Sequence, residues 1–232
     1  MLLHLKNLLT PAELAKARHL LRDDAPWTSG SRSAGAQALT QKNNQQLVQD
    51  SPASRTLQAL VLAAVQRDPL FFSATLPRRI FHPLFNRYSG SFNHYGPHID
   101  GAVLRLHDPQ EWLRSDLSCT VFLSAPEEYD GGELVLQEFG DEHQVERQIK
   151  CPAGDAVLYP GTRVHEVRPV TRGVRLASFF WIESMVRHEE QRRILLDLDM
   201  NLLQLRRQLG ETPETTALTG VYHNLLRQWA HT

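Results

Sequence analysis

The sequence predicts a mostly β protein of the α+β type, with a jelly-roll core between helical ends. Three observations predict this class. From residue 79 onward, short segments rich in β-branched and aromatic residues follow one another, separated by turn signals such as DGG at 130–132 and PG at 160–161. Before residue 79 and after residue 183, apolar residues recur at helical spacing instead. Many short strands with regular turns form a sandwich or barrel, and we expect a double-stranded β-helix of the cupin-like kind.

The same pattern divides the chain into three parts. We expect an N-terminal helical and loop region at 1–78, the jelly-roll domain at 79–183 and a C-terminal helical hairpin at 184–232. At 232 residues, of which 41% are hydrophobic, the chain suits one domain with appendages and a proper core. Its 25 basic and 26 acidic residues give a net charge of −1, so nothing in the charge balance indicates a nucleic-acid partner.

Several features predict a soluble cytoplasmic protein with no membrane association. The start, MLLHLKNLLTP, lacks the basic region and cleavage site of a secretory signal. The longest near-apolar run, residues 57–65, is too short to span a bilayer. Cys119 and Cys151 lie in or beside strand-like segments, and in a reducing compartment we expect both to be buried thiols.

The expected helices have recognisable ends. Residues 10–13, TPAE, place an N-cap threonine, a proline at the first helical position and a glutamate suited to a capping box. Residues 54–66 carry the apolar stripe of a second helix. After residue 183 a helical pattern runs to Gly210, a good C-cap, and another follows at about 215–230. We expect these two to form an antiparallel hairpin that covers the jelly roll or joins a second subunit in a homo-oligomer.

The polar stretch at 23–50 allows two interpretations. It is rich in Gly, Ser, Asn and Gln, and Trp27 is its only large apolar anchor. One interpretation is a solvated connection between helices. The other is a substrate-side lid or an edge strand that carries Lys42 and Asn44. The sequence leaves both interpretations open.

Two separated segments carry a candidate metal site. His98 and Asp100 are two residues apart, so their side chains point to the same face of an extended strand. His165 lies much later, in another segment with strand-like alternation. Two histidines and one carboxylate, with the remaining positions open, are the ligand set of non-haem Fe(II) oxygenases, whereas a closed four-ligand site would be structural. Because an isolated H-x-D is usually only a polar pair near a turn, a further element is needed.

Arg175 supplies that element. It lies among apolar residues of a later strand-like segment, and an arginine in such a setting needs an anionic partner because an unpaired buried charge is costly. Its planar fork suits a carboxylate. Arg168 is the second choice for this role, while Arg163 and Arg172 adjoin turns and are expected to be solvated.

The order H-x-D, a distant H and then R resembles the signature of the Fe(II)- and 2-oxoglutarate-dependent dioxygenases. Several segments resemble the prolyl-hydroxylase-like branch: NRYSG at 86–90, HID at 98–100, DGGEL at 130–134, PAGDAVLYPG at 152–161 and HEVRPVTRGVRLASFFW at 165–181. Together with the C-terminal tail they are similar to the bacterial PKHD-type hydroxylases, a group associated with iron-uptake loci. The resemblance extends from KNNQQL at 42–47 through the C-terminal helices.

The resemblance implies an enzyme and assigns its site. Fe(II) would be bound by three ligands, His98, Asp100 and His165. The cosubstrate 2-oxoglutarate would chelate the iron and pair with Arg175, assisted by Tyr88 on a strand expected to neighbour that of His98. O2 would take the last position, and ascorbate would keep the iron ferrous. The expected reaction is hydroxylation of an unidentified peptidyl residue or iron-uptake-related small molecule, with release of succinate and CO2.

Other interpretations remain at this stage. A non-catalytic iron-binding jelly-roll module or sensor would keep the three ligands but would not need Arg175. A zinc hydrolase is a weaker option, because no general base is evident beside the ligands. Phe122 stands where the resemblance leads us to expect a second tyrosine, which leaves one cosubstrate hydrogen bond unassigned. His94 and His107 flank the metal segment and are expected to be solvated or to touch a substrate. Trp181 and Phe179 share the strand parity of Arg175 and are expected in the core or in the pocket wall.

Overall fold

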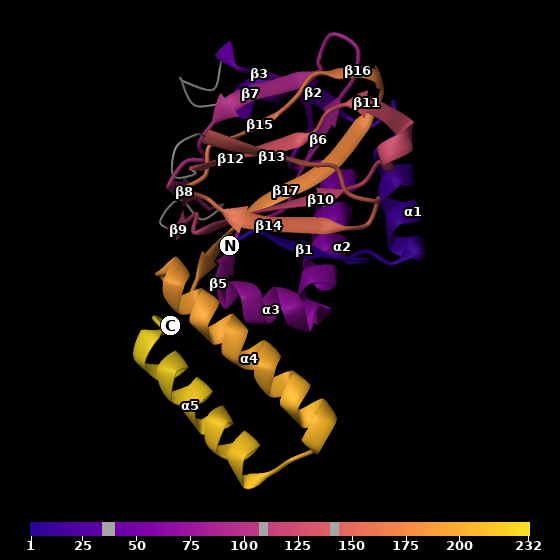
Figure 1. The fold of residues 1–232 in the computed structure, drawn as a ribbon. Helices are drawn as coiled ribbons and strands as arrows, with labels where there is room; N and C mark the ends of the chain where they lie inside the picture. Colours follow the sequence, from indigo (N-terminus) through magenta and orange to yellow (C-terminus); the bar gives the residue numbers. More distant parts are fainter. Residues whose placement is uncertain (34–39, 107–110, 140–143) are drawn as a thin grey trace.

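Two antiparallel sheets lie face to face in the computed structural model of the protein, which describes residues 1–33, 40–106, 111–139 and 144–232 (Figure 1). The larger sheet has the spatial order β1 (Leu3–Leu5), β14 (Ala156–Pro160), β10 (Leu117–Phe122), β17 (Arg175–Ser184), β6 (Leu84–Tyr88), β4 (Gln45–Leu47) and β2 (Trp27–Ser29), with β5 (Pro77–Ile80) also pairing with β17. The smaller sheet has the order β13 (Gln144–Ile149), β12 (Leu134–Phe139), β15 (His165–Val167), β7 (His94–His98) and β3 (Lys42–Asn43). This arrangement confirms the predicted jelly-roll core.

Two further strand pairs flank the main sheets. They are β11 (Tyr129–Gly131) with β16 (Val170–Gly173), and β8 (Val103–Arg105) with β9 (Trp112–Arg114). Between the main sheets, Phe122 and Tyr159 of the larger sheet pack with Leu134 and Leu136 of the smaller one. The strands that contain IFHPLFNRY, LSCTVFLS, GELVLQ, QVERQIK, DAVLYP, TRVHEVRPV and GVRLASFFWI were all expected from the sequence, and the structure confirms them.

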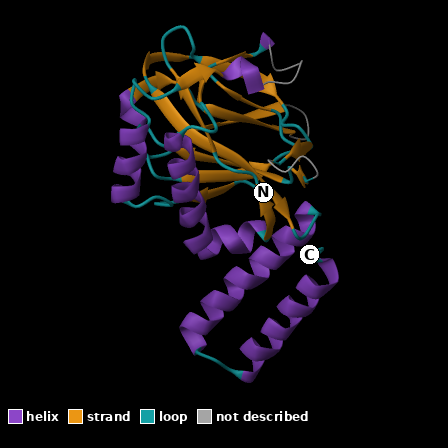
Figure 2. Cartoon of the chain, turned by 180° about the vertical axis from the view of Figure 1, so that it is seen from behind, coloured by secondary structure: helices purple, strands orange, loops and turns teal. Residues whose placement is uncertain are grey.

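Three helices cover the outer face of the larger sheet (Figure 2). They are α1 (Pro11–Leu20), α2 (Pro52–Arg67) and α3 (Pro69–Thr75). Ala17, Val61 and Phe71 of these helices belong to one apolar cluster with Cys119 and Phe180 of the sheet. Because alternate residues of a strand point to opposite faces, the other face of the same strands is left to meet the second sheet and to line a cavity.

The capping pattern at 10–13 is confirmed. The Thr10 side chain accepts a hydrogen bond from the Glu13 backbone at 3.3 Å, and the Glu13 carboxylate accepts one from the Thr10 backbone at 2.9 Å. Glu13 also pairs with Arg67 at the end of α2, and Arg67 lowers the pKa of Glu13 to about 2. The capped end of α1 is therefore tied to α2.

The region before residue 79 contributes strands to both main sheets. β1 pairs with β14, β4 pairs with β6, and β3 pairs with β7. Of the two interpretations of residues 23–50, the edge strand is therefore confirmed for Lys42, and Asn44 lies between β3 and β4. The domain boundary at residue 78 stays a prediction. In the structure, residues on both sides of it contribute strands to the same sheets.

The C-terminal hairpin consists of α4 (Glu189–Leu209) and α5 (Pro213–Trp229), which lie side by side and extend away from the sheets (Figure 1). Gly210 ends α4 with a φ of +74°, a backbone conformation that favours glycine, so the predicted C-cap is confirmed. Val186 and Leu195 pack with Leu76, which attaches the hairpin to the core. No helix among the described residues combines the length and the apolar character that crossing a membrane requires. A homo-oligomer through this hairpin stays a prediction.

Candidate metal and cosubstrate site

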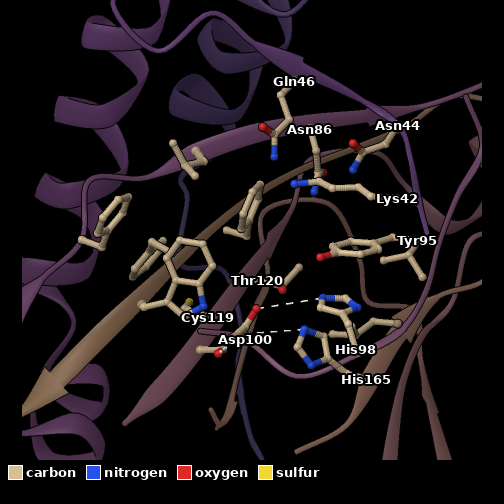
Figure 3. Close-up of a pocket in the computed structure, with 18 of the residues that line it drawn as sticks. Lys42, Asn44, Gln46, Asn86, Tyr95, His98, Asp100, Cys119, Thr120 and His165 are labelled. Atoms are coloured by element: carbon tan, nitrogen blue, oxygen red, sulfur yellow. Dashed lines mark hydrogen bonds and ion pairs between the residues drawn. The ribbon is translucent and has the colours of Figure 1, made fainter. Parts of the chain in front are cut away.

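The structure brings together the three predicted metal ligands. His98 is the last residue of β7, His165 is the first residue of β15, and the two residues are partners in the antiparallel pairing of these strands. Asp100 follows β7, with its carboxylate 4.0 Å from His98 Nε2 and 3.7 Å from His165 Nε2 (Figure 3). One ligand atom from each residue lies within 4.8 Å of the other two. This spacing suits a single metal ion between them.

Hydrogen bonds to the protein orient all three side chains. Nδ1 of His98 bonds to the Gly96 carbonyl at 2.8 Å, and Nδ1 of His165 bonds to the Arg163 carbonyl at 3.0 Å. In each ring Nδ1 therefore carries the proton, and Nε2 is left as the metal-binding atom. The Ser118 hydroxyl donates to Asp100 at 2.7 Å. Burial, reinforced by the neighbouring His165, lowers the pKa of His98 to about 4, so His98 is in the neutral form that binds metals.

Two tyrosines that the sequence did not single out hold the imidazole rings. Tyr95 stacks on His98 with ring centroids 3.5 Å apart and an interplanar angle of 11°. Tyr159 meets His165 edge-on at 5.2 Å. Beyond Tyr95, the Lys42 ammonium lies 5.2 Å from the tyrosine ring, and burial lowers the pKa of Lys42 to about 8. Strand alternation did not indicate Tyr95, because Tyr95 and His98 point to opposite faces in a regular strand. Their rings nevertheless stack face to face.

Arg175 lies at the start of β17 and is only 1% exposed. Its guanidinium is 5.2 Å from the Tyr88 ring and 5.5 Å from the Phe122 ring. None of its three nitrogens has a hydrogen-bond partner among the residues that the structure describes. A buried cation without a partner is costly, so this position is suited to an anionic ligand.

The competing arginines lie elsewhere. Arg168, the second choice from the sequence, forms ion pairs with Glu146 and Glu166. Arg172 is exposed and pairs with Asp130. Both are already neutralised, and neither lines the cavity that contains the metal ligands. Arg175 is therefore the arginine that faces this cavity.

The prediction that Tyr88 lies on the strand beside that of His98 is wrong. Tyr88 belongs to β6 of the larger sheet and is the direct partner of Arg175 on β17, whereas His98 belongs to the smaller sheet. The chain crosses between the sheets after β6, and sequence distance alone does not reveal such a crossing. Tyr88 still lines the cavity, where its hydroxyl accepts a hydrogen bond from Asn86 at 3.3 Å. Burial raises the pKa of Tyr88, so its hydroxyl stays protonated.

Tyr129 on β11 is a further residue that the sequence did not indicate. Its hydroxyl is buried and has no hydrogen-bond partner among the described residues. Burial raises its pKa, while the positive charge of Arg175 acts in the opposite direction, so the two groups lie near each other. Because Phe122 has no hydroxyl, Tyr129 is a candidate for the cosubstrate hydrogen bond that the sequence left unassigned.

A cavity of about 550 Å³, a size typical of sites for small molecules, connects the metal ligands with Arg175 and Tyr88, and Tyr129 is not among the residues that line it. Its walls include the three metal ligands, Arg175 and Tyr88, and also two sets of further residues. The apolar set includes Phe81, Leu84, Leu104, Phe179 and Trp181, and the polar set includes Gln49. Four further members of the polar set, Lys42, Asn44, Gln46 and Asn86, are labelled in Figure 3. The expected place of Phe179 and Trp181 in the pocket wall is confirmed. His94 bonds to Asn93 at 3.0 Å and is not part of the wall, and His107 lies outside the described residues.

Comparisons with known proteins agree with this fold. A family model described as the 2OG-Fe(II) oxygenase superfamily matches residues 83–183, and one described as the PKHD-type hydroxylase C-terminal domain matches residues 189–231. Among solved structures, a prolyl hydroxylase from Trichoplax adhaerens in complex with a hypoxia inducible factor peptide has a TM-score of 0.54 at 17% identity, covering 84% of this chain and 86% of that one. A non-heme alpha ketoglutarate dependent carbocyclase from nogalamycin biosynthesis has a TM-score of 0.55 at 16% identity, covering 80% of each chain.

The match over residues 83–183 indicates a 2OG-Fe(II) oxygenase domain. Two relatives narrow the class. The PKHD-type hydroxylase of Verminephrobacter eiseniae is 60% identical over 233 residues, and that of a Polaromonas species is 54% identical over 233 residues, each match covering 100% of both chains. The chain therefore belongs to the PKHD-type hydroxylase family. It is a 2-oxoglutarate-dependent hydroxylase, and the family implies Fe(II), 2-oxoglutarate and O2 as its cofactor and cosubstrates.

Proposed function

We propose that this hydroxylase binds Fe(II) with His98, Asp100 and His165, binds the far carboxylate of 2-oxoglutarate with Arg175, and releases succinate and CO2 as it hydroxylates its substrate. The observation that carries the proposal is the state of Arg175. Its guanidinium is buried with three unpartnered nitrogens, in the same cavity as the three metal ligands. A carboxylate matches the geometry of the guanidinium fork and would neutralise its charge. A non-catalytic iron-binding module would have no use for this costly group.

The residues present fit a ferrous ion. Two neutral imidazoles and a carboxylate converge from one side, and no fourth His, Cys, Asp or Glu joins them in the described part of the chain. Such a set leaves positions open for a cosubstrate and oxygen. A structural zinc site would be closed by a fourth ligand, so this arrangement favours a catalytic iron.

The roles of the chain's own residues follow from their contacts. When bound, iron and 2-oxoglutarate supply the oxidising chemistry. Ser118 holds the Asp100 carboxylate, and the stacked ring of Tyr95 covers one face of His98. Tyr88 and Tyr129 place two protonated hydroxyls beside Arg175, where they can donate to a carboxylate. The apolar wall that includes Trp181 restricts water around the reacting carbon.

We also propose a substrate class, a reductant and a cellular compartment for this enzyme. The substrate is a peptidyl residue or an iron-uptake-related small molecule, and ascorbate maintains the iron in its ferrous state. We place the enzyme in the cytoplasm, which is supported by the two buried free thiols of Cys119 and Cys151. Screening candidate substrates for stimulated succinate release would identify the substrate.

The test is anaerobic addition of Fe(II) and 2-oxoglutarate to the purified protein. We expect a weak visible charge-transfer band in the wild type. Arg175→Ala should remove the band at moderate cosubstrate concentration and weaken 2-oxoglutarate binding by about 100-fold, because a buried charge pair is lost. Iron binding should change by less than about threefold, since Arg175 does not contact the metal ligands.

Arg168→Ala is the matched control, because Arg168 is paired at the surface and should leave both affinities unchanged. Absence of the band despite stoichiometric iron would contradict the proposal. Equal loss of iron and 2-oxoglutarate binding in Arg175→Ala would mean that Arg175 has a structural role. Turnover supported by zinc without 2-oxoglutarate would favour a hydrolase instead.

A further inference from the structure

The polar wall of the cavity contains two asparagines that the proposed chemistry does not use. Asn44 lies between β3 and β4, and Asn86 lies on β6. The pairing of β4 with β6 places Gln46 opposite Asn86, and Asn44 lies just before β4, so Asn44 and Asn86 are near each other in the cavity wall. Figure 3 shows both amides, with Lys42 and Gln46, across the cavity from His98, Asp100 and His165.

The Asn44 amide is 1% exposed, and neither its nitrogen nor its oxygen has a hydrogen-bond partner among the described residues. The oxygen rests against Gly30, where an added Cβ would lie only 1.8 Å from it. The Asn44 side chain lies beside the Tyr88 hydroxyl and acts to lower its pKa, as an approaching N–H donor does. With its oxygen against Gly30, the Asn44 amide therefore has its N–H group on the side of Tyr88 and the cavity.

Asn86 offers the complementary group. Its nitrogen donates to the Tyr88 hydroxyl at 3.3 Å, while its oxygen has no hydrogen-bond partner in the described structure. The residue is 8% exposed, so water has little access to this oxygen. Buried polar groups are nearly always paired, and those that are not call for a ligand or an ordered water. The wall thus presents one unused donor and one unused acceptor.

We propose, resting on the function proposed above, that Asn44 and Asn86 bind an uncharged amide group of the substrate. The amide oxygen accepts from Asn44, and the amide N–H donates to Asn86. A carboxylate would meet the Asn86 oxygen with like partial charge, and a hydrocarbon would leave both groups unpaired. Leu84, two residues before Asn86 on β6, and Trp181 continue the wall with apolar surface. The substrate class is therefore an amide attached to an apolar carbon.

The test uses N-methylacetamide as the probe and methyl acetate as its isostere without an N–H group. Mn(II) replaces Fe(II), and the paramagnetic relaxation of the probe's methyl protons reports binding in the cavity, with and without 2-oxoglutarate. We expect the amide to be relaxed about fivefold more than the ester in the wild type. Asn44→Ala and Asn86→Leu should bring the amide down to the level of the ester, both with and without 2-oxoglutarate.

Gly30→Ala provides a variant that leaves both asparagines in place. Its new methyl group displaces the Asn44 amide, so the preference for the amide should fall as in Asn44→Ala. Gly220→Ala, at a helical site where nothing lies within 4 Å of the new methyl group, is the matched control and should keep the preference. Thermal unfolding and Mn(II) titration establish that each variant is folded and loaded.

Two results would overturn the inference. Equal relaxation of amide and ester by the wild type would show that the wall does not select an amide. Weaker 2-oxoglutarate binding in Asn44→Ala, with unchanged probe relaxation, would assign the asparagine to the cosubstrate. The arm without 2-oxoglutarate separates this inference from the proposed function, because amide selection can be measured even if the cosubstrate does not bind.

Discussion

The two ends of the cavity are built in opposite ways. At the metal end, His98, His165 and Asp100 each have a hydrogen bond to the protein that fixes their orientation. At the other end, Arg175 is buried without any hydrogen-bond partner among the described residues. The metal ligands are therefore oriented before a metal binds, whereas the arginine is held in an unfavourable state that an anion would relieve. The metal ligands thus have hydrogen-bond partners within the protein, whereas Arg175 is left for a ligand to pair with.

The largest expected effect comes from replacing Arg175 by methionine. This change removes an unpaired buried charge but keeps much of the side-chain volume, so the free protein should become more stable by roughly 1–4 kcal/mol. Binding of 2-oxoglutarate should be lost at the same time. Urea unfolding without ligand, combined with calorimetric titration of the Mn(II) form, measures both quantities. A less stable variant would mean that Arg175 stabilises the free protein, and that it is not held in an unfavourable state at this end of the cavity.

A smaller effect is expected at the metal end. Ser118→Ala removes the hydroxyl that donates to Asp100, and loss of such an orienting group should weaken metal binding by about 10-fold. Affinity for 2-oxoglutarate at saturating metal should stay the same. Ser178→Ala is the control, since the buried Ser178 hydroxyl has no hydrogen-bond partner among the described residues. Mn(II) titration of both variants is the measurement, and equal affinities in the two would deny Ser118 an orienting role.

The smallest effect should come from Tyr129→Phe. The Tyr129 hydroxyl is buried and unpartnered, so its removal should change the free energy of unfolding by less than about 0.5 kcal/mol. If the hydroxyl donates to the bound cosubstrate, affinity for 2-oxoglutarate should fall by about fivefold. Comparing urea unfolding with cosubstrate titration separates these effects. An unchanged cosubstrate affinity would leave Arg175 and Tyr88 as the only candidates at this end.

The sequence was sufficient for those features that depend on local period and spacing. The spacing of His98 and Asp100 predicted that they lie together, although β7 ends at His98, and the apolar setting of Arg175 identified it among four neighbouring arginines. The capping box at Thr10 and the C-cap at Gly210 were also predictable, because each depends on a few adjacent residues. Such signals are strong because the physical requirement is contained in one short segment.

Features that depend on the path of the chain between sheets were not predictable. Strands β3 and β4 have two and three residues, too few to show a period, so their place in the two sheets could not be read from the sequence. The pairing of Tyr88 with Arg175 depends on which strands the fold places side by side, and the stacking of Tyr95 on His98 depends on the local geometry of β7. The unpaired state of Asn44 likewise depends on which groups the fold brings around it.

The joint at Asn44 has a consequence for how such enzymes diverge. Only this residue separates β3 in one sheet from β4 in the other, so one short piece of chain joins the two sheets in the wall of the cavity. The joint lines the cavity but contains none of the three metal ligands and not Arg175. Substitutions here would change the cavity wall and leave those four residues in place. A mutant library confined to 42–47 is accordingly the shortest route to an altered selectivity.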